Sequence, residues 1–400
     1  MLCFLLSLPA SASEPWDLTG SSLRDQAMAG AGAAGSVPGS AIPIDPAGVT
    51  SVDGELLQVS WHRTAPDVRL DREGLLTESI DAVDLSIAAG APLRSLRIGG
   101  GFDLYLPLPM AVDTVVHVDQ TSAQAPMLED AWDFMAFDAA GGIGWGPVDV
   151  ALGAAVGMDL LADTTAVVED ISGGEATDEG LELQEGIDVT LDRQIVWQIA
   201  PMVGAHLRHD DLDAYLSWRG PLGMRSYGDN DLEFNVNFFG ITLDPVDLEL
   251  DYLSGWSPAR LAGGVSWDFG RVRPELGARY MWSSAWRDSQ NQEPETPFVD
   301  VLQLAGGVEG DLWKGLVLRA GYARHPSPVP DQVGDSRIAD ADRNLFAGGL
   351  AWSSEGLPRE GDASELALSV QYHRLSERPV ADSRISGRIW VVSAGVATEF

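Results

Sequence analysis

Three glycines near the N-terminus, Gly30, Gly32 and Gly35, match the G-x-G-x-x-G spacing of a dinucleotide-binding loop. Asp53 follows at about the distance where that motif places a ribose-binding carboxylate. The chemistry requires a buried strand before the glycines and a helix after them, so that the helix N-terminus meets the pyrophosphate. Here the preceding segment is polar, and three prolines between positions 38 and 46 would interrupt any helix. The glycines therefore need another explanation.

Two histidines three residues apart, His206 and His209, lie beside Asp210 and Asp211 and offer metal-ligating groups. On a strand, residues three apart point to opposite faces, so we expect no shared ion and no metal site. Serines near histidines elsewhere suggest the dyad of a hydrolase, but no nucleophile motif surrounds them. We therefore predict neither catalysis nor a cofactor. These pairs are Ser60 with His62 and Ser369 with His373.

The chain has 400 residues and a formal charge of −35, from 60 acidic and 25 basic side chains. Nucleic acids bind positive surfaces, so this charge argues against a nucleic-acid partner. Residues 1–12 contain a short apolar core and the small-x-small sequence Ala10-Ser11-Ala12, which predict a cleaved secretory signal. The single cysteine, Cys3, would leave with it. No run of about eighteen apolar residues follows, so an exported membrane form would have to be a closed barrel.

Apolar residues alternate with polar or small ones in many segments, among them 148–160, 247–252 and 365–373. A period of two predicts strands with one apolar face, because a helix would group residues three and four apart. A soluble sandwich or propeller alternates in the same way, but acidic residues at successive inward positions favour a hydrated lumen. Tryptophans near strand ends resemble the aromatic girdles of membrane barrels. They are Trp61, Trp145, Trp218, Trp267, Trp282, Trp352 and Trp390.

Short turns and long polar loops alternate along most of the chain, as expected for a barrel with tight periplasmic turns and long external loops. The predicted turns lie near 146–147, 209–210, 244–245, 270 and 311–314. The predicted loops cover about 107–132, 163–191, 220–230, 285–298, 324–343 and 375–386. The chain ends in an alternating strand with Trp390 and Phe400 on one face. This ending resembles the signal that the outer-membrane barrel assembly machinery recognises.

The glycine-rich segment 28–49 resembles the N-terminal plug of the FadL/TodX family, outer-membrane transporters of long-chain fatty acids and hydrocarbons. That plug carries a glycine- and alanine-rich stretch followed by Asn-Pro-Ala-Gly. Here the element is Asp45-Pro46-Ala47-Gly48, with Asp in place of Asn. Later stretches are also similar to strands of the family, and the resemblance covers most of the chain. They are 257–267 and 274–286, with Pro258, Gly263, Trp282 and Ser283, and 318–331 and 340–352.

The resemblance implies an all-β transmembrane antiparallel barrel of about 14 strands. Our own count in the sequence is about sixteen candidate strands, which stays as the alternative. Over-splitting of weak segments near 82–91 or 231–254 would explain the surplus. The implied organisation is a signal over 1–12, an N-terminal periplasmic hatch over 13–54 that plugs the lumen, and a barrel over 55–400.

By the same resemblance, the hatch moves through its glycines (Gly30, Gly32, Gly35) and through Asp45–Gly48. Ligand would pass from an external groove to an interior pocket and leave sideways through a kink in an early strand. Arg324 and His325, near the mouth of a late strand, are candidates to contact a ligand carboxylate. The alternative is a charge on the barrel rim that faces lipopolysaccharide.

The expected function is therefore passive transport of long-chain fatty acids or similar hydrophobic compounds across the outer membrane of a Gram-negative bacterium. A hydrophobic molecule partitions into hydrocarbon more readily than it crosses a watery pore, which fits release into the membrane. We expect a monomer among outer-membrane lipids and lipopolysaccharide. Two alternatives stay open: a non-transporting barrel with a surface binding or structural role, and an outer-membrane lipid hydrolase.

Overall fold

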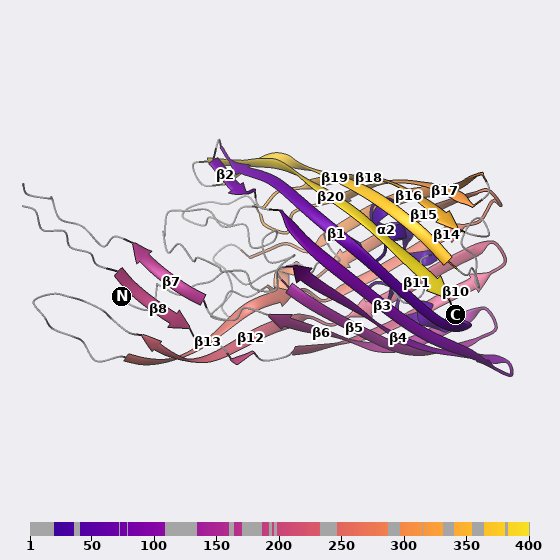
Figure 1. Cartoon of the computed structure of the whole chain (residues 1–400), viewed down its shortest axis with the longest axis horizontal. Coiled ribbons are helices and arrows are strands. Elements are labelled where there is room, and N and C mark those ends of the chain that lie inside the picture. The colour runs from indigo at the N-terminus through magenta and orange to yellow at the C-terminus, as the bar shows by residue number, and fades with distance from the viewer. Residues whose placement is uncertain are drawn as a thin grey trace, which may run out of the picture.

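The computed structural model of the chain is a closed antiparallel β-barrel with a small N-terminal segment inside it (Figure 1). Strand β1 closes the ring, because it pairs with β20 along one edge and with β3 along the other. The structure describes residues 20–35, 41–71, 73–77, 79–108, 134–159, 164–169, 186–191, 194–195, 198–232, 246–286, 297–313, 315–330, 340–353, 364–380 and 383–399.

Fourteen strands form the ring, so the lower of the two predicted strand counts is confirmed. Each pairs antiparallel with the next, as short hairpin connections allow. In ring order they are β1 (Gly54–Leu70), β3 (Ile80–Leu93), β4 (Leu96–Leu108), β5 (Phe134–Trp145), β6 (Val148–Asp159), β10 (Gln198–His209), β11 (Leu212–Arg219), β14 (Arg260–Trp267), β15 (Val272–Met281), β16 (Val301–Trp313), β17 (Leu316–His325), β18 (Arg343–Ser353), β19 (Ser364–Val380) and β20 (Ser383–Glu399).

In the part of the chain that the structure describes, six further strands lie outside the ring. Short β2 (Glu73–Leu76) pairs with the end of β1. Strands β12 (Leu222–Leu232) and β13 (Val246–Ser257) pair with each other, β12 also pairs with β9 (Gln194–Ile195), and β7 (Thr164–Glu169) pairs with β8 (Gly186–Leu191). The β7–β8 and β12–β13 pairs extend past the barrel at the end with the long connections (Figure 1).

These extra strands correct three expectations. The predicted loops over 163–191 and 220–230 contain strands, and the alternating segment 247–252 belongs to β13 rather than to the barrel wall. Near 231–254 the extra strand is therefore a real strand outside the ring rather than an over-split wall strand. Segment 82–91 adds no extra strand, because it lies in the ring strand β3.

The tight turns lie at one end of the barrel, where they include 146–147, 210–211 and 270–271. The turn predicted at 244–245 lies outside the described residues. The loop predicted at 375–386 is wrong, because β19 and β20 continue through it with one register shift between Leu375 and Arg378. Ser376 and Glu377 are both exposed and polar, so this part of the strand shows no alternation.

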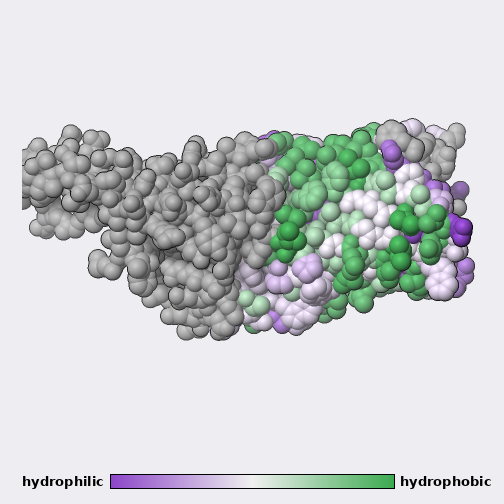
Figure 2. All heavy atoms as spheres, turned by 90° about the horizontal axis from the view of Figure 1, so that it is seen from below, coloured by the Kyte–Doolittle hydropathy of each residue, from purple (hydrophilic) through white to green (hydrophobic). Residues whose placement is uncertain are grey.

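The ring alternates between an apolar outer face and a polar inner face. Figure 2 shows apolar side chains over much of one barrel face, with hydrophilic residues gathered at one end. Exposed aromatics include Trp145, Phe269 and Trp313 near the tight turns, and Trp390, whose ring packs at a tilt against Tyr372, nearer the other end. The inner face carries buried polar side chains, among them Gln58, Ser60, His62, Asp84, Asp103, Asp138, Asp149, Arg260 and Arg319.

The hatch folds into short helical pieces that are buried within the ring. They are α2 (Leu23–Ala27), the 3-10 turns η2 (Gly32–Gly35) and η4 (Pro46–Ser51), while a further turn, η5 (Ser283–Ala285), follows β15. Helix α2 contacts β17–β20, η2 contacts β11, β14 and β15, and η4 contacts β3–β6 and β10. Within the described ranges, no helix is long and apolar enough to cross a membrane.

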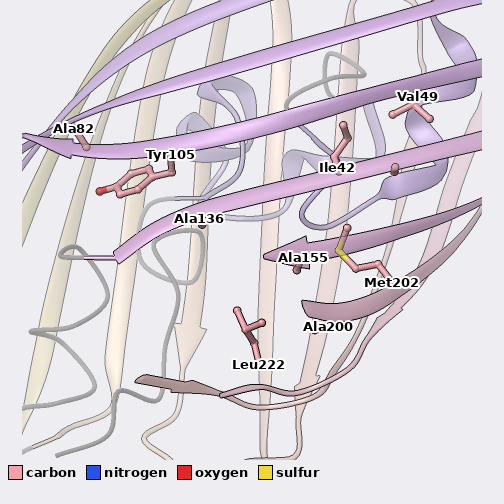
Figure 3. Packing of buried hydrophobic residues seen from close by; sticks show 10 residues of the cluster. Ile42, Val49, Ala82, Tyr105, Ala136, Ala155, Ala200, Met202 and Leu222 are labelled. Atoms are coloured by element: carbon pink, nitrogen blue, oxygen red, sulfur yellow. The ribbon is translucent and has the colours of Figure 1, made fainter. Parts of the chain in front are cut away.

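Small wall residues let the hatch approach closely. Ile42 and Val49 of the hatch lie inside the ring beside the wall residues Ala155, Ala200 and Met202 (Figure 3). On the other side, a Cβ at Gly321 would collide with the backbone of hatch residue Met28, and one at Gly349 would lie 2.6 Å from Cβ of Ala27. The fit of the hatch therefore depends on missing side chains in the wall.

Two adjacent glycines of β18 test this fit. Gly349 faces the hatch, whereas a Cβ at Gly348 meets nothing closer than 3.8 Å. We expect Gly349→Ala to lower the free energy of unfolding by about 1–3 kcal/mol, the usual effect of overpacking. Gly348→Ala should leave it unchanged. Urea unfolding of the purified barrel measures both, and equal losses would contradict the close packing of hatch and wall.

Candidate functional site in the barrel lumen

The fingerprint glycines shape the hatch rather than a nucleotide loop. A helix, α2, precedes them where a strand would be required, and Gly30 has a φ of +85° in the turn that follows. A Cβ at Gly32 would lie 2.9 Å from Cα of Asp25, and one at Gly35 would lie 3.0 Å from the guanidinium of Arg24. These two glycines therefore make room for α2 and for its arginine.

Arg24 is buried and forms the first attachment of the hatch to the wall. Its guanidinium donates to Glu275 on β15 at 2.8 Å and to both carboxylate oxygens of Glu309 on β16 at 2.9 and 3.0 Å. Glu309 also accepts from Arg319 at 3.1 Å, and Arg319 makes two 2.9 Å bonds to Glu365. Charges buried in this way stabilise a structure only when each one is matched. Removing one of these charged side chains would therefore leave a neighbouring buried charge without a full set of partners.

Next to Arg24, the carboxyl group of Asp25 is fully buried against the wall. Burial raises the pKa of Asp25, and the hydrogen bond from the Ser21 backbone and the charge of Arg279 oppose this shift in part. Helix α2 begins at a capped end, because the Ser22 side chain accepts from the Asp25 backbone at 3.0 Å.

Gln26 forms the second attachment. Its amide lies 3.3 Å from Nδ1 of His62 on β1, and on β19 Ser369 donates to its side chain and Gln371 to its backbone. Within this cluster Ser60 lies 3.0 Å from Nε2 of His62.

The arrangement around His62 differs from a hydrolase triad. Nδ1 faces the Gln26 amide, which donates to it, while the nearest carboxylate, Asp84, lies 3.9 Å from Nε2, the nitrogen that Ser60 also contacts. A triad needs the serine on one ring nitrogen and the carboxylate on the other. This group therefore holds the hatch and lacks the geometry to activate Ser60.

Asp45 forms the third attachment. It precedes η4, but its side chain does not cap that turn. Instead, Oδ2 of Asp45 lies 2.5 Å from Nδ1 of His206 on β10, and both residues are buried. Nearby backbone carbonyls are also held, because Arg260 donates to Pro43 at 2.6 Å and Ser217 donates to Ile44. Pro46 packs against Gly204 of the same strand, and Ala47 and Gly48 are buried behind it.

The two histidines that suggested a metal site are separated by the barrel wall. His206 faces the lumen, whereas the side chain of His209 is 65% exposed at the turn, with Nδ1 3.2 Å from Asp210. Across the part of the chain that the structure describes, no three His, Cys, Asp or Glu side chains are placed to hold an ion.

Arg324 and His325 likewise point to opposite sides of β17. The side chain of Arg324 is 62% exposed on the outside and pairs with Asp342 at 3.2 Å. His325 faces inward and lines a narrow cavity between hatch and wall, which we call the hatch cavity. Its lining includes Ala29 and Gly30 of the hatch and the wall residues Tyr215, Arg279, Gln303, His325 and Gln371, and no acidic side chain is among its described lining residues.

The end of the last strand is described as far as Glu399, so Phe400 lies outside the described residues. Trp390 and Val396 face outward on β20, as the alternation predicted.

Solved structures of similar shape were found over nearly the whole chain. A FadL homologue of Pseudomonas aeruginosa is 14% identical, covers 98% of this chain with 99% of its own, and has a TM-score of 0.57. The P. putida toluene transporter TodX is 14% identical with 96% and 99% covered and a TM-score of 0.56. The CymD monoaromatic hydrocarbon channel is 13% identical with 96% and 100% covered and a TM-score of 0.58. The chain has the FadL-type fold.

The likeness to these barrels lies in the fold more than in the sequence. No family model matches the chain, and a search of curated proteins found no match. Its early strands also pair without interruption: β4 stays in register with both β3 and β5. The kink expected in an early strand therefore does not appear as a break in the pairing of β4.

The Arg24 attachment yields a stability prediction. We expect Arg24→Met to lower the free energy of unfolding by about 3–5 kcal/mol, because it leaves Glu275 buried without the arginine that bonds to it and takes from Glu309 one of its arginine partners. Arg324→Met is the matched control, since its exposed pair with Asp342 contributes less than about 1 kcal/mol. Urea unfolding of the two purified variants gives the comparison. Similar losses would show that Arg24 does not anchor the hatch.

Proposed function

We propose that this chain is a passive outer-membrane transporter for long-chain fatty acids or similar hydrophobic compounds, and that movement of the hatch releases the cargo into the membrane. The observation that carries the proposal is a compact hatch, fastened at three places, inside a barrel with an apolar outer face. A barrel with a purely structural role has no need of a separate plug that is held to the wall by hydrogen bonds and ion pairs. The likeness to barrels described as a FadL homologue, a toluene transporter and a hydrocarbon channel supports the same function.

The moving parts in this proposal are the Gly30–Gly35 turn and Asp45–Gly48. Gly30 borders the hatch cavity, and Asp45 holds η4 against β10, so a shift of either end would open space beside the wall. A hydrophobic cargo would then exchange polar surroundings for hydrocarbon, which is favourable.

We assign the contact with a ligand carboxylate to His325 rather than to Arg324. His325, Arg279 and Gln303 bring hydrogen-bond donors to the hatch cavity, while Arg324 faces the outside of the barrel. Arginine and amide groups are common partners of carboxylates.

The remaining parts of the proposal concern export and assembly. The chain is exported with loss of residues 1–12, and Phe400 together with Trp390 serves as the assembly signal. The barrel acts as a monomer among outer-membrane lipids and lipopolysaccharide, and it catalyses no reaction. Its hatch comprises residues 13–54, and residues 55–400 form the barrel.

Uptake of labelled oleate tests the function. The chain and two variants, Asp45→Ala and a deletion of the hatch, are expressed in Gram-negative cells that lack their own transporter. Each must first show the heat-dependent gel shift of a folded barrel. We expect uptake with the parent chain and a severalfold reduction with Asp45→Ala, because without this contact η4 no longer returns to its place against β10 after each opening. A folded parent that takes up neither oleate nor toluene would overturn the proposal and favour a surface binding or structural role.

The carboxylate contact has its own prediction. His325→Leu should reduce uptake of oleate severalfold and leave uptake of toluene unchanged, because toluene has no charged group for the site to recognise. Arg324→Gln, one residue away on the outer face, is the control and should behave as the parent does. Equal effects of His325→Leu on both compounds would contradict a head-group contact.

A further inference from the structure

The attachment at Asp45 differs from the one at Arg24 in its cationic group, which is an imidazole at Asp45 and a guanidinium at Arg24. An arginine stays protonated at any pH that a cell meets, so the cation of the Arg24 ion pairs does not change with pH. An imidazole ordinarily titrates near pH 6.5, between a charged form and a neutral one. The bond between Asp45 and His206 is therefore an ion-paired attachment of the hatch whose cation can be gained or lost with a proton.

The surroundings of His206 place a carboxylate near each ring nitrogen. Nδ1 lies 2.5 Å from Asp45, and Nε2 lies 4.0 Å from Asp213 on β11. Across the strands, His206 stands opposite Asp149 on β6 and Tyr215 on β11. The doubly protonated ring can thus face a negative acceptor from both nitrogens.

The other charges nearby are already matched. Asp149 accepts from Arg97 on β4 at 2.9 Å and from Arg208, which follows His206 on the same face of β10. These two arginines occupy both oxygens of Asp149. Of the carboxylates around His206, Asp45 is therefore the one that bonds directly to its ring.

We propose that Asp45 and His206 form a proton-controlled latch that holds the η4 end of the hatch against β10. The protonated imidazole makes an ion pair with Asp45, and the neutral ring keeps only a single hydrogen bond to it. Protonation of the ring tightens the latch, and loss of that proton loosens it. The consequence for transport rests on the proposed function, whereas the latch itself is a property of the folded barrel.

The latch can be tested without any cargo. Ala47, at 0% exposure in η4, is replaced by cysteine in a Cys3→Ser chain, so that a maleimide reagent reacts only when this part of the hatch leaves the wall. The labelling rate of the purified, folded barrel is measured at about pH 5.5 and about pH 8, on either side of the ordinary histidine range. Each rate is divided by that of the same chain carrying His206→Gln, which cancels the pH dependence of the thiol reaction itself.

At the lower pH we expect the parent to label about three- to tenfold more slowly than His206→Gln, and at the higher pH this ratio should approach one. The Asn side chain of Asp45→Asn accepts a hydrogen bond but carries no charge. The labelling rate of this variant, divided by that of His206→Gln, should therefore not change with pH. His209→Gln, on the exposed turn, should match the parent. If Ala47→Cys fails to fold, Thr50→Cys reports on the same buried turn.

A ratio that stays constant between the two pH values would overturn the latch, and so would equal effects of His206→Gln and His209→Gln. The outcome is independent of the uptake assay. A pH-dependent ratio in a barrel that takes up no compound leaves the latch standing and removes the proposed function. Uptake by a barrel whose labelling ratio does not change with pH would support the proposed function and overturn the latch.

Discussion

A ring of fourteen strands encloses a lumen wider than its own side chains can fill, since about eight strands already give a fully packed interior. The hatch fills this space, and most features of the inner wall follow from its presence. Glycines such as Gly321 and Gly349 stand where the hatch approaches, because a Cβ there would collide with the backbone of Met28 or with Cβ of Ala27. Larger side chains of the wall are polar and reach into the lumen to bind the hatch.

The three attachments lie on different sides of the ring and differ in kind. Arg24 is held by paired carboxylates on β15 and β16, Gln26 by neutral hydrogen bonds to β1 and β19, and Asp45 by one imidazole on β10. A buried arginine between two carboxylates is costly to remove, because Glu275 loses the arginine that bonds to it and Glu309 loses one of its arginine partners. The η4 end has fewer charges to separate. The hatch is therefore expected to detach first at Asp45 and last at Arg24.

Alternation in the sequence predicted strands correctly, because it reflects one apolar face and nothing more. For the same reason it could not distinguish β13, which lies outside the ring, from the wall strands. The loop wrongly expected at 375–386 has polar residues such as Glu377, so the period of two disappears where the strand continues. Contacts between distant segments were also beyond reach: Arg24 and Glu275 are 251 positions apart, and the register that joins them is set only by the closed ring.

The period of two also tells which side chains of a strand can face the lumen. Arg324 and His325 are successive residues of one strand, so only one of them could face the lumen. The same rule separated His206 from His209 and left His206 alone on the inner face. An acid at position 45, where the family resemblance expects Asn, brings a charge into a buried turn, and such a charge requires a partner. An inward histidine is the kind of partner that an acid at this position needs, but which histidine serves becomes clear only when the ring brings β10 to the hatch.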